Sequence, residues 1–324
     1  MAELEVDHAL TFDFATPHTK WAQPYALGKV RVLFFADGTG TNPRECVELM
    51  QRFDLDAQAV FWARIIDSND SHWHGGEVGE RRMLNLLEQK WDCFVFLGIP
   101  LSKIPTVQKQ KILKAVTEGA GIVFVGLDDS TPLEQNNRLN PLPPFLATGP
   151  VGDAYKIRQG LGIHLPNRPN IDYHEGWEVD YDYWQERLGR AVLWAAGREP
   201  ASQIQMSISP AVPTTESAQR TLSVKLTGKL LGEKPILHLS VRRPGDNPIP
   251  WPLQEAAAES PLVFEIPMLS EGSYHAEARI VSSAGVETWA TIPFQIEHDR
   301  KIAELKLDQS WGEPGGRHLR ICCA

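Results

Sequence analysis

The sequence contains few cysteines and no long apolar run. Its four cysteines are Cys46, Cys93, Cys322 and Cys323, and their spacing matches neither a disulfide framework nor a CxxC metal motif, so we predict free thiols. No stretch approaches the roughly 18 apolar residues of a membrane-spanning helix, and the amino-terminal region lacks the basic start and apolar core of a signal peptide. These absences predict no membrane partner and leave the location open, with the cytoplasm as the default.

Excess positive charge is absent as well. The chain has 32 Lys and Arg residues against 41 Asp and Glu residues, which gives a net charge of -9. A protein that binds a phosphate backbone needs a positively charged surface, so we predict no nucleic-acid partner. The composition, 42% hydrophobic and 23% charged, is that of an ordinary globular protein, and 324 residues suffice for two domains with separate cores.

The first part of the chain alternates short apolar runs with helical patterns. The apolar runs lie at residues 30–35, 59–63, 93–97 and 122–125. A last run at 162–165 and a helical pattern at 184–196 complete the series. Strands that are apolar on both faces and separated by helices predict a doubly wound parallel sheet covered by helices on both sides. We expect this α/β domain to span residues 29–200, after a leader of residues 1–28.

After Pro200 the pattern becomes that of β-strands. Five partly alternating segments lie at residues 221–226, 236–241, 262–266, 274–280 and 288–296. Short strands separated by Gly and Pro turns predict an all-β part, which we assign as an immunoglobulin-like β-sandwich over residues 205–298. A helix stop and Pro200 coincide between Gly197 and Gln205, so we expect two domains that fold separately.

Residues 299–324 do not complete a domain. The stretch 302–307 alternates like a new strand, and a Pro-Gly turn at 313–316 follows it. No further segment is present to pair with this strand. We therefore expect these residues to be an incomplete tail, either the start of a further domain of a multidomain protein or the product of truncation.

Three segments of the α/β part, at residues 29–49, 91–126 and 181–200, resemble a known family. They are similar to class I glutamine amidotransferase-like domains of large bacterial proteins, akin to the trimerisation domain of certain β-galactosidases. The resemblance covers residues 25–200. It implies a flavodoxin-like fold and a carbohydrate-related setting.

The catalytic signature of that family is missing. Its cysteine lies on a sharp turn after a strand, which exposes the thiol and directs backbone amides at the oxyanion. The equivalent stretch here, 122–129, has no cysteine, and His174 and Glu175 are adjacent where the family separates them by one residue. Cys93 begins an apolar run, where a cysteine acts as a small apolar residue. We predict that the chain is not a glutaminase.

One motif in the α/β part is a candidate ligand site. It consists of Asp37, Gly38, Thr39, Gly40 and Thr41, which follow a strand and precede a helix. Open α/β sheets bind ligands at this position, and helix amides attract anions there, so the motif can hold a carboxylate, a phosphate or a sugar hydroxyl, with Arg44 adding charge. The alternative is a tight turn that needs glycine, because no complete GxGxxG or Walker motif is present.

Two further groups have a candidate role. His72 and His74, with acidic residues nearby, have imidazoles that can reach one ion, but a third ligand at metal spacing is missing, so we predict no metal and no cofactor. The aromatic residues near the end of the α/β part can stack on a sugar ring or cover a seam between domains, and we favour the seam. These are Trp177, Tyr181, Tyr183 and Trp184.

Two functional hypotheses follow. In the first, the chain is a non-catalytic module for binding or assembly, its partner being another protein domain, a small molecule or a sugar, and a homo-oligomer is compatible with this role. In the second, it is a carbohydrate-processing hydrolase or sugar-binding protein that uses carboxylates at the strand ends, such as Asp37, Asp128 or Glu175. Two carboxylates about 5 to 9 Å apart at an open pocket favour the second. A filled crevice or a broad apolar patch favours the first.

Overall fold

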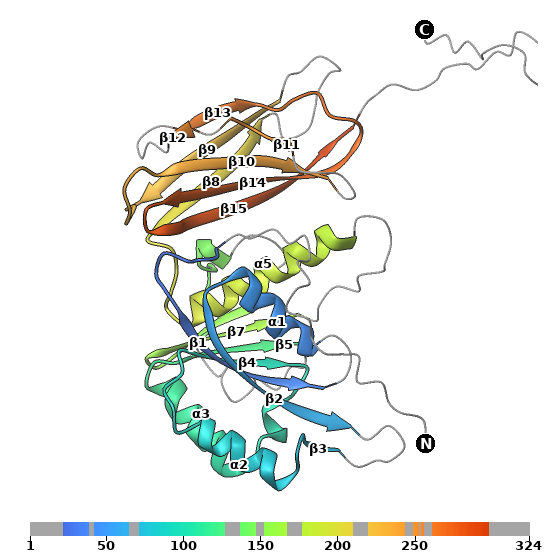
Figure 1. The fold of residues 1–324 in the computed structure, drawn as a ribbon, viewed down its shortest axis with the longest axis vertical. Helices are drawn as coiled ribbons and strands as arrows, with labels where there is room; N and C mark the ends of the chain where they lie inside the picture. Colours follow the sequence, from blue (N-terminus) through green and yellow to red (C-terminus); the bar gives the residue numbers. More distant parts are fainter. Residues whose placement is uncertain are drawn as a thin grey trace, which may run out of the picture.

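The computed structural model describes residues 22–38, 42–64, 71–126, 137–146, 152–166, 177–209, 220–243, 249–252, 254–255 and 261–297. A mostly parallel sheet with helices on both faces forms the first part, and two antiparallel sheets form the second (Figure 1). Within this described portion, the helices are too short or too polar to cross a membrane. The predicted tail, 299–324, lies outside the described residues.

The large sheet has seven strands in the order β3-β2-β1-β4-β5-β7-β6. Its strands are β1 (Val30–Asp37), β2 (Leu55–Arg64), β3 (Ser71–Trp73), β4 (Cys93–Leu97), β5 (Gly121–Val125), β6 (Asp153–Ile157) and β7 (Gly160–Leu165). The central strands β2, β1, β4, β5 and β7 are parallel to their neighbours, whereas the edge strands β3 and β6 are antiparallel. This arrangement confirms the mostly parallel α/β sheet predicted from the alternating pattern.

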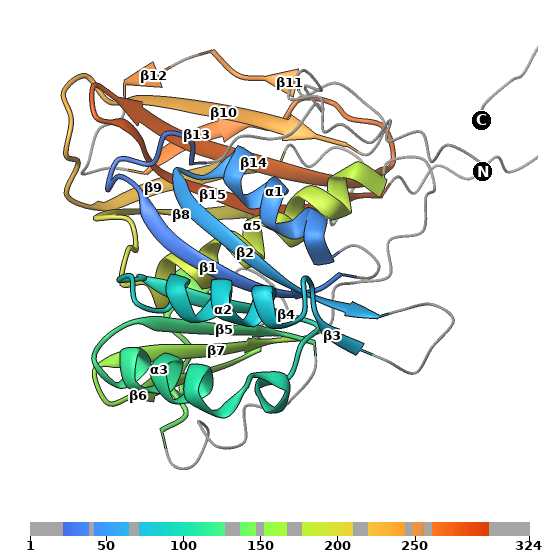
Figure 2. The same ribbon diagram turned by 60° about the horizontal axis from the view of Figure 1, so that its bottom comes forward.

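Helices cover both faces of this sheet. They are α1 (Asn42–Arg52), α2 (Glu77–Leu86), α3 (Thr106–Thr117) and α5 (Trp177–Ala195), with short 3-10 turns at Leu101–Lys103 and Pro144–Leu146. Successive side chains of a strand point to opposite faces, so Val32 and Phe34 pack under α1 and α5 while Leu33 and Phe35 pack against α2 and α3. Figures 1 and 2 show α1 and α5 between the large sheet and the antiparallel sheets.

The second part is a pair of antiparallel sheets. One contains β8 (Ser202–Ser209), β9 (Thr221–Gly228) and β13 (Leu262–Glu265) in the order β13-β9-β8. The other contains β10 (Ile236–Arg242), β11 (Ile249–Pro250), β14 (Gly272–Ser282) and β15 (Gly285–Ile296) in the order β11-β10-β14-β15, and β12 (Gln254–Glu255) also pairs with β10. Residues such as Leu222, Leu239 and Ala276 fill the core between them. We refer to this part as the sandwich.

Several boundaries differ from those predicted. β8 begins at Ser202, three residues before the predicted start of the sandwich at residue 205, and its buried residues Ser202 and Ile204 alternate with partly exposed ones. The helix α1 begins at Asn42, directly after the candidate ligand motif. β6 is an edge strand that carries three buried residues, Ala154, Tyr155 and Ile157, and the apolar pattern did not reveal it.

Part of the predicted leader belongs to the fold. Ala22 and Tyr25 are buried, and their backbones form bridges to Phe53 and Val286 respectively. The amide of Ala26 donates to the carbonyl of Val286 (2.9 Å), and the amide of Val286 donates to the carbonyl of Pro24 (3.1 Å). Residues 22–28 therefore tie the start of β15 to the α/β part.

We call the contact between the two parts the seam. An apolar cluster that both parts share lies at this contact. Trp289 of β15 is 1% exposed, and its ring lies 5.7 Å from Tyr25, 5.6 Å from Phe53 and 5.9 Å from Phe145. Ala290 faces the core of the sandwich, whereas Trp289 points outward to the α/β part. A shared cluster of this kind couples the packing of the two parts, and their separate folding stays a prediction.

Candidate functional site

The predicted ligand motif begins at the end of β1. Asp37 is the last residue of that strand and is 5% exposed. The amide of Gly38 donates to the carbonyl of Trp62 (2.8 Å), and a Cβ at position 38 would lie 3.1 Å from the same oxygen. A side chain at position 38 would thus require the Trp62 carbonyl to shift by a few tenths of an ångström, and this close approach to β2 is compatible with the tight-turn alternative. Residues 39–41 lie outside the described residues.

The other predicted ligand residues do not gather around Asp37 in the described part of the chain. Arg44 is half-exposed, its Nε donates to Glu48 Oε1 (3.1 Å), and its guanidinium lies 5.4 Å from the Tyr181 ring. Its charge is therefore directed along α1. Asp128 and Glu175 lie outside the described residues.

The carboxyl edge of the sheet consists of backbone turns where the structure describes it. The amide of Gly98 donates to Val125 O (3.2 Å), and that of Gly126 donates to Leu165 O (3.1 Å). The Nε2 of His164 lies 3.2 Å from the carbonyl of Gly126. Both glycines have positive φ, 66° and 91°, which favours glycine there.

The described cysteines are buried away from this edge. Cys93 opens β4 at the opposite, amino end of the strand, and burial, reinforced by Asp92, raises the pKa of its thiol. Burial also raises the pKa of Cys46 on α1 to about 12, with Glu45 adding to the effect. Because the thiolate is the nucleophilic form, neither environment activates a cysteine.

The two candidate metal ligands lie at β3. His72 and His74 flank the buried Trp73 and are both exposed. Across the described ranges, no group of three or more His, Cys, Asp or Glu residues is arranged to hold a metal ion.

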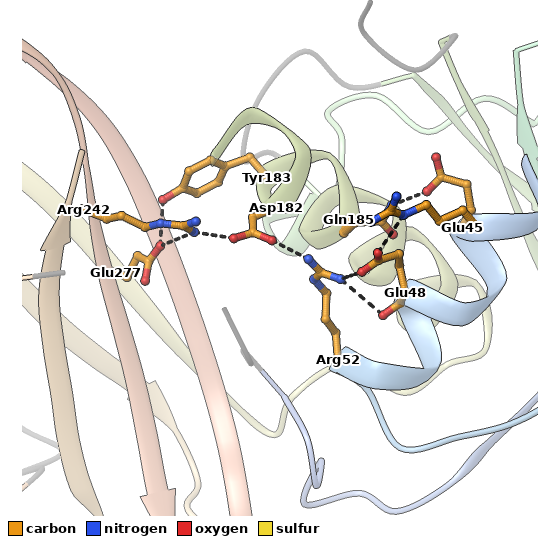
Figure 3. Close-up of polar contacts among 9 residues, drawn as sticks. Glu45, Glu48, Arg52, Asp182, Tyr183, Gln185, Arg242 and Glu277 are labelled. Atoms are coloured by element: carbon orange, nitrogen blue, oxygen red, sulfur yellow. Dashed lines mark hydrogen bonds and ion pairs between the residues drawn. The ribbon is translucent and has the colours of Figure 1, made fainter. Parts of the chain in front are cut away.

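The most extensive polar cluster lies at the seam, and sequence reasoning missed it. On α1, the fully buried Arg52 donates to Glu48 through Nη1 and to Asp182 of α5 through Nη2. The other oxygen of Asp182 accepts Nη1 of Arg242 on β10, and the same nitrogen lies 3.9 Å from Glu277 of β14. Figure 3 shows this line of alternating charges running from α1 through α5 to the sandwich.

Tyr183 and His275 lie at the sandwich end of this line of charges. The hydroxyl of Tyr183 donates to Glu277 (3.0 Å), and its ring stacks on His275 with centroids 3.7 Å apart. Burial raises the pKa of Glu277 to about 7, partly offset by Arg242. Burial, reinforced by Arg242, lowers the pKa of His275 to about 4. The location of Tyr183 agrees with our preference for a seam role.

A further buried ion pair, between Arg190 and Glu186, lies on α5. The Nε and Nη2 of Arg190 donate to Glu186 Oε1 at 2.9 and 2.7 Å, and Thr291 of β15 donates to the other oxygen (2.7 Å). The guanidinium of Arg190 lies 4.8 Å from the Phe145 ring and 4.9 Å from the Trp289 ring, and it donates to the Trp289 carbonyl (3.0 Å). Its charge is thus met by an anion, two aromatic faces and a carbonyl.

The helix α5 is buried on two sides. Its apolar residues Leu188 and Val192 face the large sheet, whereas Asp182, Glu186 and Arg190 belong to the seam. The spacing of these three residues, four apart on one helix, would ordinarily indicate a solvated face. Each hydrogen bond of such a face needs its partner at one position. The paired charges therefore fix the orientation of α5 relative to the sandwich.

Close packing at the seam predicts an effect at Gly189 of α5. A Cβ there would lie 2.1 Å from Cε2 of the buried Phe53 ring. Gly189→Ala should therefore destabilise the protein by about 1 to 3 kcal/mol, although alanine favours helix by about 1 kcal/mol. Urea unfolding measures this. Adding Phe53→Leu should recover part of the loss, and an additive double variant would contradict the packing explanation.

No known protein family and no curated protein matches the sequence. A cytoplasmic protein from Salmonella typhimurium LT2 is similar in structure, with 8% identity, a TM-score of 0.33, and coverage of 51% of this chain and 99% of that protein. A β-glucosidase from Kluyveromyces marxianus matches with 11% identity and a TM-score of 0.20, over 72% of this chain and 34% of the enzyme.

The same β-glucosidase in complex with glucose gives 10% identity and a TM-score of 0.18, over 73% of this chain and 34% of the enzyme. This chain thus spans about a third of the β-glucosidase. Similarities at these scores carry no conclusion about family, substrate or activity.

Proposed function

We propose that the chain is a non-catalytic binding or assembly module of a larger protein. It combines a flavodoxin-like domain that resembles amidotransferases with an immunoglobulin-like sandwich docked on it. The observation that carries this proposal is that the buried charges of α1 and α5 pair with each other and with Arg242 of the sandwich. These pairs join the two parts. Such pairs give orientation more than stability, because the cost of burying charges offsets their attraction.

The strand order supports the flavodoxin-like assignment. Among the parallel strands, the order β2-β1-β4-β5-β7 corresponds to 2-1-3-4-5 in chain sequence, which is the order of that fold. Helices on both faces, with α1 and α5 on one side and α2 and α3 on the other, agree with double winding.

The sandwich has two features of the immunoglobulin-like fold. Its sheets, β13-β9-β8 and β10-β14-β15, correspond to strands E-B-A and C-F-G of that fold. Near the start of β14, the hydroxyl of Tyr274 donates to the carbonyl of Ser270, four residues upstream, at 2.9 Å. A tyrosine with this bond resembles the tyrosine corner of such domains and supports the assignment.

A direct assay tests the absence of amidotransferase chemistry. The full chain incubated with glutamine should release no ammonia above a no-enzyme control, because Gly126 follows β5 where the family has its cysteine turn and Cys93 is buried at the other edge. Ammonia release that disappears in Cys93→Ala would contradict the proposal.

The hydrolase alternative needs a separate assay. Chromogenic glycosides should remain uncleaved by the wild-type chain and by Asp37→Asn alike. Cleavage that Asp37→Asn, Asp128→Asn or Glu175→Gln abolishes would instead support a carbohydrate-processing enzyme, since glycoside hydrolysis depends on paired carboxylates.

A further inference from the structure

The carboxylate of Glu277 shares the cation Arg242 with Asp182. Asp182 binds both Arg52 and Arg242, and Glu186 receives two N–H groups from Arg190. Arg242 uses the same Nη1 for Asp182 and reaches Glu277 only at 3.9 Å. The side chain of Glu277 is 12% exposed, so water compensates little of its charge.

The groups around Glu277 come from every element packed against it. Asp182, Tyr183 and Glu186 face it from α5, and Arg242 faces it from β10. On its own strand, Arg279 interacts with it, and His275 stacks on its hydroxyl partner Tyr183. In register, the neutral Ser240 of β10 and Thr291 of β15 lie opposite it. The carboxylate of Glu277 is thus surrounded by those of Asp182 and Glu186 and by Arg242, which it shares with Asp182.

We propose that the contact between α5 and the sandwich is proton-linked, and that Glu277 takes up a proton when this contact closes and releases it when the contact opens. A protonated Glu277 keeps a carbonyl oxygen that accepts from Tyr183 and avoids repulsion from Asp182 and Glu186. The seam is then a contact whose strength depends on pH, independently of what the module binds.

The sign follows from the direction of the shift. Because folding raises the pKa of Glu277 from 4.5 to about 7, its contribution to stability is complete below pH 4.5 and is lost as the pH rises through 7. His275 acts in the opposite sense, because folding lowers its pKa from 6.5 to about 4 and its contribution is lost as the pH falls. In the wild type the two dependences largely cancel between pH 4.5 and 6.5.

Glu277→Gln separates the two contributions, since it imitates the protonated acid at every pH. The ratio of the folding equilibrium constant of Glu277→Gln to that of the wild type should rise by at least about tenfold between pH 5 and pH 8, measured by urea unfolding. Any constant effect of the amide cancels in this comparison. Glu186→Gln, which breaks the pair with Arg190, is the control and should weaken the fold at both pH values.

Infrared spectroscopy of the folded protein provides a second measurement. At pH 6 the wild type should show a carbonyl band of a protonated carboxyl group that Glu277→Gln lacks. In His275→Gln, stability should fall steadily as the pH rises from 5 to 8, because the opposing histidine is absent. A ratio that stays flat with pH, or the absence of the infrared band at pH 6, would overturn the proposal.

Discussion

Replacement of Asp182 by alanine is expected to destabilise the protein by about 3 to 5 kcal/mol. Its two oxygens accept from Arg52 and Arg242, whose side chains are 0% and 8% exposed. Removal of the carboxylate leaves two buried guanidinium groups without their shared anion, and one arginine comes from each part of the molecule. Asp182→Asn keeps the volume of the side chain and should cost nearly as much, because charge rather than packing is lost.

The matched control for Asp182 is Asp153, which pairs with Arg138 on the surface. Their side chains are 36% and 65% exposed, so Asp153→Ala should cost less than about 1 kcal/mol. Free energies of unfolding from urea titration of the wild type and the three variants make the comparison. An Asp182→Ala protein as stable as Asp153→Ala would refute a buried network at the seam.

Replacement of Trp289 by alanine is expected to cost about 3 to 5 kcal/mol and to lower the stability of both parts together. The indole fills the space between Tyr25, Phe53 and Phe145, although it belongs to β15 of the sandwich. Its removal therefore leaves a cavity in the cluster that also supports α1 and α5. Far-ultraviolet circular dichroism follows the helices, and hydrogen exchange of β9 amides follows the sandwich.

Both signals should report the same loss in Trp289→Ala. In the control Trp251→Ala, the missing ring contacts Phe264 in the sandwich core, so no cavity opens beside the helices. If the helices of Trp289→Ala unfold with wild-type stability while the sandwich does not, the two parts fold independently, as the sequence alone suggested.

The large sheet could be predicted because its signal is local. Buried parallel strands are apolar on both faces, and the runs at 93–97 and 122–125 fall within β4 and β5. The position of the candidate ligand motif was also correct, since β1 ends at Asp37 and α1 begins at Asn42. The reason for Gly38 was not predictable, because it depends on the Trp62 carbonyl of a neighbouring strand.

The seam could not be predicted because its signals are not local. Arg242 and Glu277 alternate with core residues along their strands, which is the pattern of a solvent-exposed face. Only the packing of that face on α5 turns them into buried partners of Asp182 and Tyr183. The same limit applies to Trp289, whose alternation identifies an outward side chain and not the surface that covers it.

Because Tyr25 forms a bridge with Val286 of β15, the packing around the amino-terminal residues is completed only after β15 has been synthesised. The residues that form the large sheet leave the ribosome before β15, yet the cluster above α1 and α5 needs Trp289 to fill it. Until β15 has emerged, Tyr25, Phe53 and Phe145 lack their common partner, the ring of Trp289. A nascent chain halted before β15 should therefore expose apolar surface and recruit chaperones, even though every strand of its parallel sheet has already been made.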